Sequence, residues 1–145
     1  MRIVIAAVGK VKDRPLREAI DEYVGRVRRY VAIDEVEIAD GAIDRVRAGF
    51  EKATREATVV ALEVAGEALS SETFARTLER HGARGKGTVA FLIGGADGLP
   101  PELSRAAHAR LSLSSLTFPH RLARLVLVEQ IYRAMTILRN EPYAH

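Results

Sequence analysis

The feature that most constrains the fold is an alternation of short apolar runs with longer amphipathic segments. Three runs rich in β-branched residues, 2–8, 58–64 and 88–93, are bounded by turn or breaker residues. Runs of this kind are typical of strands buried on both faces of a sheet. Residues 33–39 alternate between apolar and charged side chains and predict a less buried strand. Residues 111–116 are a short fifth candidate.

Helical patterns fill the intervals between these runs. In the first interval apolar residues recur at helical spacing, at Leu16, Ile20, Tyr23, Val24 and Val27. One such stripe is typical of a helix that packs on a sheet. Residues 42–57 predict a second, highly charged helix, Ser70 or Ser71 can cap a third, and Pro100 and Pro101 open a fourth. The alternation predicts a mostly parallel sheet between two helical layers, an α/β/α fold in one domain over residues 1–145.

The last helical pattern, residues 122–138, is apolar on more than one face. A helix of this kind must be buried on more than one side. The second covering surface can be another copy of the chain, which predicts a homodimer. The alternative is a monomer in which the helix is buried between the sheet and its neighbouring helices.

Composition excludes several kinds of site. The absence of cysteine excludes disulfides, thiolate metal sites and a cysteine nucleophile, and the 4 histidines form no pair at metal-ligand spacing. We therefore expect no metal. The apolar runs fall well short of the roughly 20 residues that span a membrane, and the opening strand is unlike a secretory signal. These patterns predict a cytoplasmic protein without a membrane segment.

The basic residues are mainly arginine, 18 of 22, although the net charge is only +3. The planar guanidinium group binds phosphates and stacks on bases, which favours a nucleic-acid partner. A codon bias toward arginine would produce the same composition. Composition alone therefore leaves the partner open.

Residues 91–101 combine a buried strand, a glycine-rich turn at Gly94, Gly95 and Gly98, and the start of a helix. Ligands of open α/β sheets bind outside the carboxyl ends of strands, where glycines let the backbone approach closely. The spacing matches neither a dinucleotide fingerprint nor a phosphate loop. The segment is either part of a ligand site or simply a tight turn.

A second candidate segment, residues 111–121, is an apolar and hydroxyl-rich run that Pro119 ends before the last helix. Backbone groups in a loop of this kind can bind the edge of an adenine ring. The hydroxyl groups of Ser114, Ser115 and Thr117 are equally suited to capping a helix or forming turns.

Together these segments resemble the ribosomal RNA large subunit methyltransferase H family. The shared motifs occur in the same order: Leu-Ile-Gly-Gly-x-x-Gly-Leu at 92–99, Leu-Ser-x-x-Thr-x-Pro-His at 113–120, Arg-x-x-Leu-x-Glu-Gln-x-Tyr-Arg-Ala at 124–134 and Asn-x-Pro-Tyr at 140–143. The opening Ala-Val-Gly-Lys at 7–10 and the total length match as well. The resemblance is therefore specific and covers both ends of the chain.

The resemblance implies a SPOUT-type α/β fold with a C-terminal trefoil knot, a homodimer, and S-adenosylmethionine as cofactor. It also implies methylation of N3 of pseudouridine 1915 in 23S rRNA on the assembled ribosome. Carried over to this sequence, the cofactor pocket comprises Leu62, Gly94, Gly95, Leu113, Ser114, Ser115, Leu116, Thr117 and Phe118. The tail departs from the family pattern, because Tyr143 is followed by Ala144 and His145 rather than by His and basic residues.

Methyl transfer to N3 requires loss of the N3 proton, so the site needs a base or an environment that favours the anion. His120 is the first candidate base because imidazoles titrate near neutral pH and this one adjoins the candidate cofactor loop. Arg133 can bind a phosphate or stabilise charge on the base carbonyls, and Tyr143 can stack on the target base. We expect these catalytic residues to meet between two subunits. The alternatives are that His120 caps a helix and that Glu129, another candidate base, simply pairs with Arg133.

Other functions remain open at this stage. A noncatalytic RNA-binding or ribosome-assembly factor could keep the fold without turnover, although the intact cofactor loops argue against it. A methyltransferase acting on tRNA is the nearest alternative enzyme. A nicotinamide-dependent oxidoreductase fits poorly because the glycine turn lacks the required spacing and follows a late strand.

Overall fold

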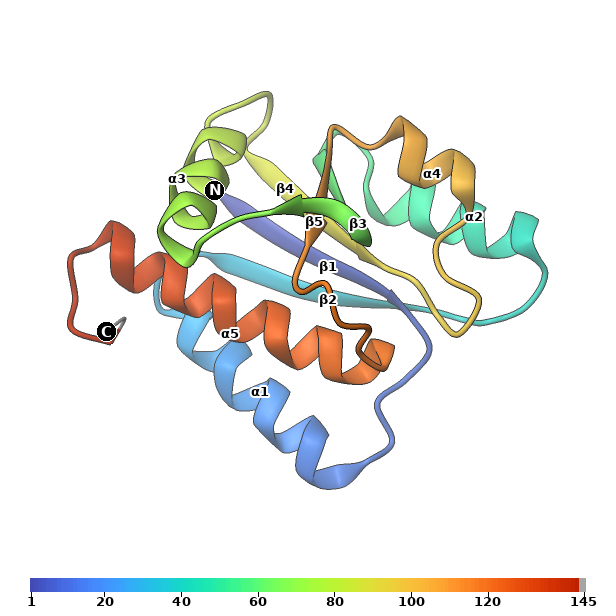
Figure 1. Cartoon of the computed structure of the whole chain (residues 1–145), viewed down its shortest axis with the longest axis horizontal. Helices are drawn as coiled ribbons and strands as arrows, with labels where there is room; N and C mark the ends of the chain where they lie inside the picture. The colour runs from blue at the N-terminus through green and yellow to red at the C-terminus, as the bar shows by residue number, and fades with distance from the viewer. Residues whose placement is uncertain (144–145) are drawn as a thin grey trace.

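The computed structural model describes residues 1–143, and its five strands all pair in parallel. The order across the sheet is β2 (Ala32–Ile38), β1 (Arg2–Val8), β4 (Thr88–Ile93), β3 (Thr58–Ala68) and β5 (Ala109–Ser112). The predicted parallel sheet is confirmed (Figure 1). Because the strands run in one direction, their carboxyl ends share one edge of the sheet.

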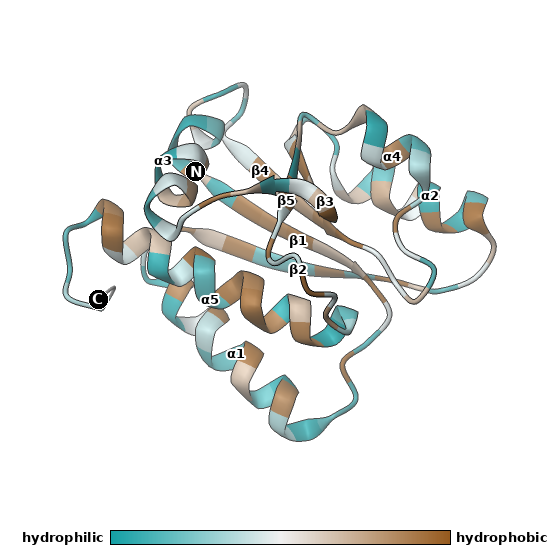
Figure 2. Cartoon of the chain, in the orientation of Figure 1, coloured by the Kyte–Doolittle hydropathy of each residue, from teal (hydrophilic) through white to brown (hydrophobic). Residues whose placement is uncertain are grey.

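Helices cover both faces of this sheet, as the sequence predicts. One face packs against α1 (Arg14–Arg28), α3 (Ser71–Gly82) and α5 (His120–Leu138), and the other against α2 (Ile43–Ala53) and α4 (Pro101–Ala106). A hydrophobic core lies on each face of the sheet, and side chains of β1 alternate between the two. Ile3 and Ile5 pack beneath α1, α3 and α5, and Val4 and Ala6 pack beneath α2 and α4. This double burial explains why the strand is apolar from Ile3 to Val8 (Figure 2).

Two element boundaries follow from local chemistry. The Ser70 side chain accepts a hydrogen bond from the Thr73 amide at 3.1 Å, which confirms the predicted cap of α3. Helix α2 ends at Ala53, four residues before the predicted end at Ala57. At its end Thr54 leaves the helical conformation while its amide and hydroxyl both donate to the carbonyl of Phe50, and the chain then turns at Glu56, whose φ of 61° lies in the left-handed region.

Strand β3 is longer and β5 is earlier than predicted. The chain bulges between Leu62 and Glu67, both of which pair with Leu111, so that β3 continues to Ala68. A Cβ at Gly66 would lie 2.8 Å from the carbonyl carbon of Leu111, so the close approach of the two backbones requires glycine. The strand pairing of β5 ends at Ser112, which leaves residues 113–119 as a loop leading into α5.

Helix α5 begins at His120, two residues before the predicted start, and lies beside α1 (Figure 1). It also packs against α3, and its inner residues Leu127, Val128 and Ile131 are fully buried. The monomer alternative therefore accounts for most of its apolar surface, although Leu122 remains 39% exposed. None of the helices in residues 1–143 is long and apolar enough to cross a membrane.

Candidate cofactor pocket

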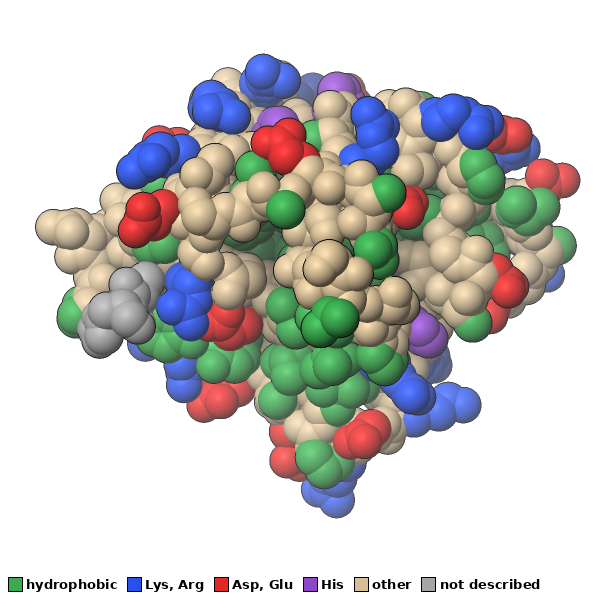
Figure 3. Space-filling view, in the orientation of Figure 1, with side chains coloured by type: hydrophobic (Ala, Val, Ile, Leu, Met, Phe, Trp, Pro, Cys, Tyr) green, Lys and Arg blue, Asp and Glu red, His purple; other side chains and the backbone are tan. Residues whose placement is uncertain are grey.

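A cavity of about 590 Å³ opens at the carboxyl edge of the sheet. Its walls come from the middle of β3, from the end of β4 and the turn that follows it, from the loop after β5 and from the first turn of α5. The volume is in the range of small-molecule sites, and the lining is mainly apolar with a few hydroxyl groups. Figure 3 shows apolar side chains gathered over the β5–α5 loop and the start of α5.

The glycine turn after β4 forms one wall of this pocket. A Cβ at Gly94 would lie 2.4 Å from the carbonyl carbon of Gly98, and one at Gly95 would lie 3.1 Å from Cγ1 of Val8. The Gly98 amide donates to the carbonyl of Gly95 at 3.0 Å, and Gly98 has a φ of 76°. The segment is thus both a tight turn and a pocket wall, so the two interpretations of the sequence are compatible.

The loop after β5 forms the facing wall. The Ser114 hydroxyl accepts from the Leu116 amide at 3.0 Å, and the Ser112 hydroxyl donates to the Ser114 carbonyl at 2.9 Å. Ser114 therefore shapes the loop, as the turn interpretation predicts. Eight of the nine predicted cofactor residues line the pocket: Leu62, Gly94, Gly95, Leu113, Ser114, Leu116, Thr117 and Phe118. Ser115 is exposed and lies outside the lining.

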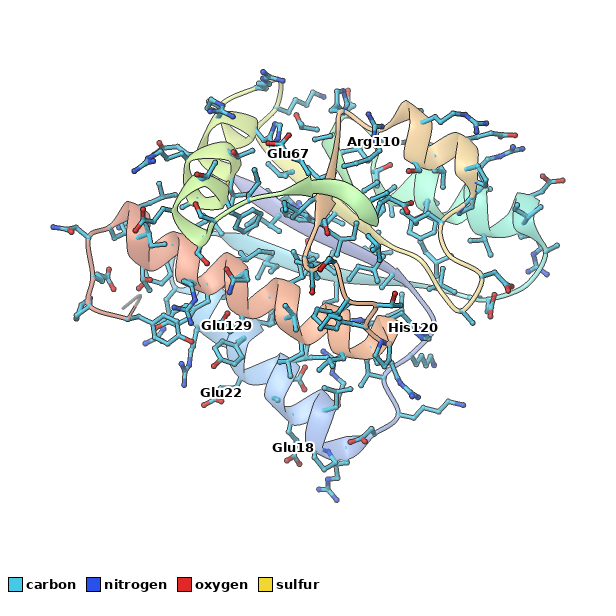
Figure 4. The ribbon with its side chains drawn as sticks, in the orientation of Figure 1. Glu18, Glu22, Glu67, Arg110, His120 and Glu129 are labelled. Carbon is cyan, nitrogen blue, oxygen red and sulfur yellow. The ribbon has the colours of Figure 1, made fainter. Side chains whose placement is uncertain are left out.

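His120 is the first residue of α5 and lines the same pocket (Figure 4). The helix follows Pro119, and no side chain caps its start. The capping role considered for His120 therefore has no support in the described residues. An imidazole at this rim can reach a group that enters the pocket.

Arg133 and Tyr143 lie elsewhere. The Arg133 Nη2 atom donates to Oε2 of Glu129 at 2.8 Å, and the Tyr143 hydroxyl donates to the same oxygen at 2.7 Å. The Arg133 guanidinium also lies 5.0 Å from the Tyr143 ring centroid. Burial and hydrogen bonds with Tyr23 and Glu129 raise the pKa of Tyr143, so its hydroxyl keeps its proton at neutral pH. The pairing of Glu129 with Arg133 is the structural alternative that the sequence left open.

Within one chain the predicted catalytic residues do not meet. His120 and Arg133 are 13 residues apart on α5, which places them about 20 Å apart along the helix axis. Arg133 and Tyr143 are absent from the pocket lining. Figure 4 shows the separation through the labels of His120 and Glu129 along α5. A single active site that used all three side chains would need a second subunit.

Arg124 is a residue that the sequence argument did not assign. Its side chain is 1% exposed and donates to Glu37 at 2.7 Å, to Glu35 at 3.3 Å and to the carbonyl of Gly9 at 3.1 Å. These contacts join the first turns of α5 to β2 and to the turn after β1. The sequence does contain a signal for the burial of Arg124, because this residue lies on the same helical stripe as the buried Leu127 and Val128.

These observations define an α/β domain that can hold a small ligand in a preformed pocket at the carboxyl edge of a parallel sheet. In residues 1–143 the His, Asp and Glu side chains form no group of three that could hold a metal. The chain belongs to the SPOUT methyltransferase family, because the family profile described as predicted SPOUT methyltransferase matches residues 1–145.

Two relatives align with this chain over 99% or more of its length. A protein from Sorangium cellulosum named ribosomal RNA large subunit methyltransferase H is 67% identical over 145 residues, covering 100% of both chains. A protein of the same name from Bifidobacterium animalis is 43% identical over 157 aligned positions, covering 99% of each. The resemblance seen in the sequence is thereby confirmed.

Solved structures share the fold at low sequence identity. A probable methylase family protein from Haemophilus influenzae has a TM-score of 0.60 at 14% identity, covering 95% of this chain and 66% of its own. A probable methyltransferase from Bordetella pertussis has a TM-score of 0.59 at 11% identity, with coverage of 92% and 93%. The strand order is compatible with the C-terminal knot that the resemblance implies, and the knot stays a prediction.

Proposed function

We propose that this protein is an S-adenosylmethionine-dependent methyltransferase that modifies N3 of a pseudouridine in 23S rRNA, in the cytoplasm and on the assembled ribosome. The observation that carries the proposal is the preformed pocket of about 590 Å³, lined by eight of the nine residues expected for the cofactor. The name of the 67% identical relative supports the choice of ribosomal RNA over tRNA.

The pocket fits the chemistry of the cofactor. Leu62, Leu113 and Leu116 supply apolar walls, and Gly94 and Gly95 bring the backbone close to the ligand. Backbone groups in the two loops are suited to the edge of an adenine ring. When bound, S-adenosylmethionine supplies a methyl group attached to a positively charged sulfur.

The protein's own residues then orient the target base and handle its proton. His120, at the rim of the pocket, accepts the N3 proton as the methyl group is transferred. Arg133 binds a phosphate or stabilises the negative charge on the base carbonyls. Tyr143 releases Glu129 and stacks on the unpaired base, an interaction that is worth about 1 to 3 kcal/mol in other proteins. Ala144 and His145, which follow it, lie outside the described residues.

A homodimer completes this site. Val64 and Leu116, at the pocket, are 51% and 72% exposed, and Leu122 on the first turn of α5 is 39% exposed. Exposed apolar side chains of this size, close together, are typical of an interaction surface. A second copy that covers them can also bring its Arg133 and Tyr143 to the His120 pocket of the first. No metal takes part in this proposal.

Nucleoside mass spectrometry of 23S rRNA tests the substrate. A strain that lacks the gene should lose one methylated pseudouridine, and a plasmid copy of the wild-type gene should restore it. The same analysis of bulk tRNA is the control. Loss of a tRNA modification with intact 23S rRNA would overturn the choice of substrate, and loss of neither would favour a noncatalytic factor.

Calorimetry with S-adenosylhomocysteine and with NAD tests the cofactor in the purified protein. We expect binding of the first and none of the second. The variants His120→Ala, Arg133→Ala and Tyr143→Ala should keep cofactor affinity and lose methylation of ribosomes. Full activity in all three variants would show that the chemistry lies elsewhere.

A further inference from the structure

A second, smaller cavity lies between α3 and the edge strand β5. It has a volume of about 170 Å³, and Phe74, Leu78 and Phe91 contribute to its apolar floor. Leu111 lies in the wall of this cavity and of the cofactor pocket, so the two cavities are neighbours across β5. Nothing in the proposed methyl transfer uses this second cavity.

Basic side chains line the cavity, namely Arg80, His81 and Arg110. Arg84 follows α3, where its amide donates to the carbonyl of His81 at 3.2 Å, and His108 directly precedes β5. Burial, Arg84, Arg80 and His108 lower the pKa of His81, which favours its neutral form. We name these five residues the arginine groove: Arg80, His81, Arg84, His108 and Arg110. Figure 3 shows basic side chains gathered over the end of α3 and over β5.

The arginines of this groove are not neutralised by the protein. Among residues 1–143, Arg80, Arg84 and Arg110 take part in no ion pair, whereas Arg17 and Arg47 on other faces each pair with several carboxylates. The groove does contain one acid, Glu67, which lies on β3 beside β5 (Figure 4). The three arginines nevertheless outnumber this acid, so the local potential is positive.

Hydrogen-bond donors in the groove remain available to a ligand. The Nη1 atom of Arg110 donates to the carbonyl of Ser104 at 2.7 Å, which fixes the guanidinium and leaves its other donors free. The Nδ1 atom of His81 is buried and has no partner among the described residues. Arg80 makes one long contact, 3.4 Å, to the Thr77 hydroxyl. The remaining guanidinium donors of Arg80 and Arg110 suit an anion with several acceptor oxygens.

We propose that the arginine groove binds a phosphate of the RNA backbone, outside the cofactor pocket. Arginine forks match phosphate oxygens in charge and geometry, and such contacts fix the register of an RNA without reading its sequence. An RNA whose target base enters the cofactor pocket can pass the neighbouring groove on the other side of β5. The inference rests on the proposed function, because it assumes that the substrate is RNA.

The salt dependence of RNA binding tests this site. For the double variant Arg80→Gln/Arg110→Gln we expect the affinity for a 23S rRNA stem-loop to fall about tenfold or more. The slope of log affinity against log salt should fall by about 0.7 to 0.9, the value for one phosphate contact. Affinity for S-adenosylhomocysteine should not change. The matched control is Arg14→Gln/Arg29→Gln, which removes the same charge from exposed positions on and after α1 and should keep the slope.

A second variant tests the sign of the effect. Glu67→Gln removes the one acid found among the described residues that line this cavity, and it should tighten RNA binding, since repulsion of the phosphate is lost. Unchanged affinity and slope in the arginine variant, with normal binding by the wild type, would overturn the groove and leave the proposed function intact. Failure of the wild type to bind or methylate the RNA would instead overturn the proposed function. If millimolar inorganic phosphate displaced the RNA completely at constant ionic strength, the groove would be a site for a small anion and the proposal of an RNA backbone contact would be overturned.

Discussion

Gly94 and Gly95 are neighbours in the turn after β4, but an added side chain at each would meet a different obstacle. At Gly94 the obstacle is backbone, 2.4 Å away, whereas at Gly95 it is the movable side chain of Val8, 3.1 Å away. We expect Gly94→Ala to lower the free energy of unfolding by about 3 kcal/mol and Gly95→Ala by about 1 kcal/mol. Urea denaturation of both variants measures this difference.

The same pair tests whether the turn belongs to the cofactor site. Gly94→Ala should also weaken S-adenosylhomocysteine binding in calorimetry, because the whole turn must shift to admit the Cβ atom. Gly95→Ala should weaken this binding less, since the backbone can stay in place when the Val8 side chain moves. If both variants lost the same cofactor affinity, the close contact between Gly94 and Gly98 would not be what requires glycine in this turn.

His81 gives the folded protein a dependence on pH. Burial, and then the charges of Arg84, Arg80 and His108, lower the pKa of His81 below its ordinary value. In the unfolded chain the imidazole takes up a proton near pH 6.5, earlier than in the folded protein as the pH falls. The free energy of unfolding should therefore decrease as the pH falls from about 6.5 through the lower pKa of the folded state.

Urea denaturation at about pH 7.5 and about pH 5.5 measures this decrease. We expect His81→Gln to lose less stability than the wild type between the two pH values, because glutamine takes up no proton. The other charged side chains that line the same cavity as His81 are Arg80, Arg110 and Glu67. The same loss of stability in both proteins would show that the pKa of His81 does not contribute.

At the scale of elements, the start of α5 depends on Arg124. This buried side chain pairs with Glu35 and Glu37 of β2 and donates to the carbonyl of Gly9. Removal of one partner of a buried ion pair usually costs about 3 to 5 kcal/mol. We expect Arg124→Ala to lower the free energy of unfolding by about 3 kcal/mol, the lower end of this range, because Arg17 still pairs with both carboxylates.

Thermal and urea unfolding of Arg124→Ala measure this cost, and Arg14→Ala is the control. The Arg14 side chain is 88% exposed and pairs only with Glu18, so we expect a change within about 0.5 kcal/mol. Because Arg124 holds the first turns of α5, its loss should also weaken cofactor binding by displacing the pocket wall at Phe118 and Ala123. A smaller loss of unfolding free energy in Arg124→Ala than in Arg14→Ala would contradict the importance of the buried hydrogen bonds and ion pairs of Arg124.

At the scale of the whole molecule, the separation of His120 from Arg133 predicts complementation between inactive subunits. We expect His120→Ala and Arg133→Ala each to be inactive as pure dimers. If the site lies between subunits, mixing the two should restore about a quarter of wild-type activity, because half of the dimers are mixed and each mixed dimer has one intact site. Methylation of ribosomes by proteins unfolded and refolded together measures this recovery.

Light scattering at micromolar concentration supplies the control, since complementation requires a dimer. Leu116→Asp should shift the mass toward the monomer and abolish the recovery, because it places a charge at the 72% exposed apolar position. A monomeric wild type would rule out the shared site. A dimer that shows no recovery would place the catalytic residues within one subunit.

The sequence by itself determined the parallel α/β architecture and most of the lining of the pocket at the carboxyl edge of the sheet. Strand β1 is apolar from Ile3 to Val8 because both of its faces are buried there, and consecutive residues carry this signal. The Ser70 cap and the glycine turn likewise depend on residues within a few positions of one another. The motifs of the two loops were close enough in the chain to be compared with a known family, which identified eight lining residues.

Only the tertiary structure decided what depends on residues far apart in the chain. The extension of β3 requires Gly66 to lie against Leu111, and the burial of Arg124 requires Glu35 and Glu37 from the second strand. The covering of α5 by α1 and α3 shows that a helix apolar on several faces need not lie at a subunit interface. The periodicity of apolar residues shows only that a helix face is buried. Which segment covers that face depends on how distant parts of the chain pack, and no local pattern contains that information.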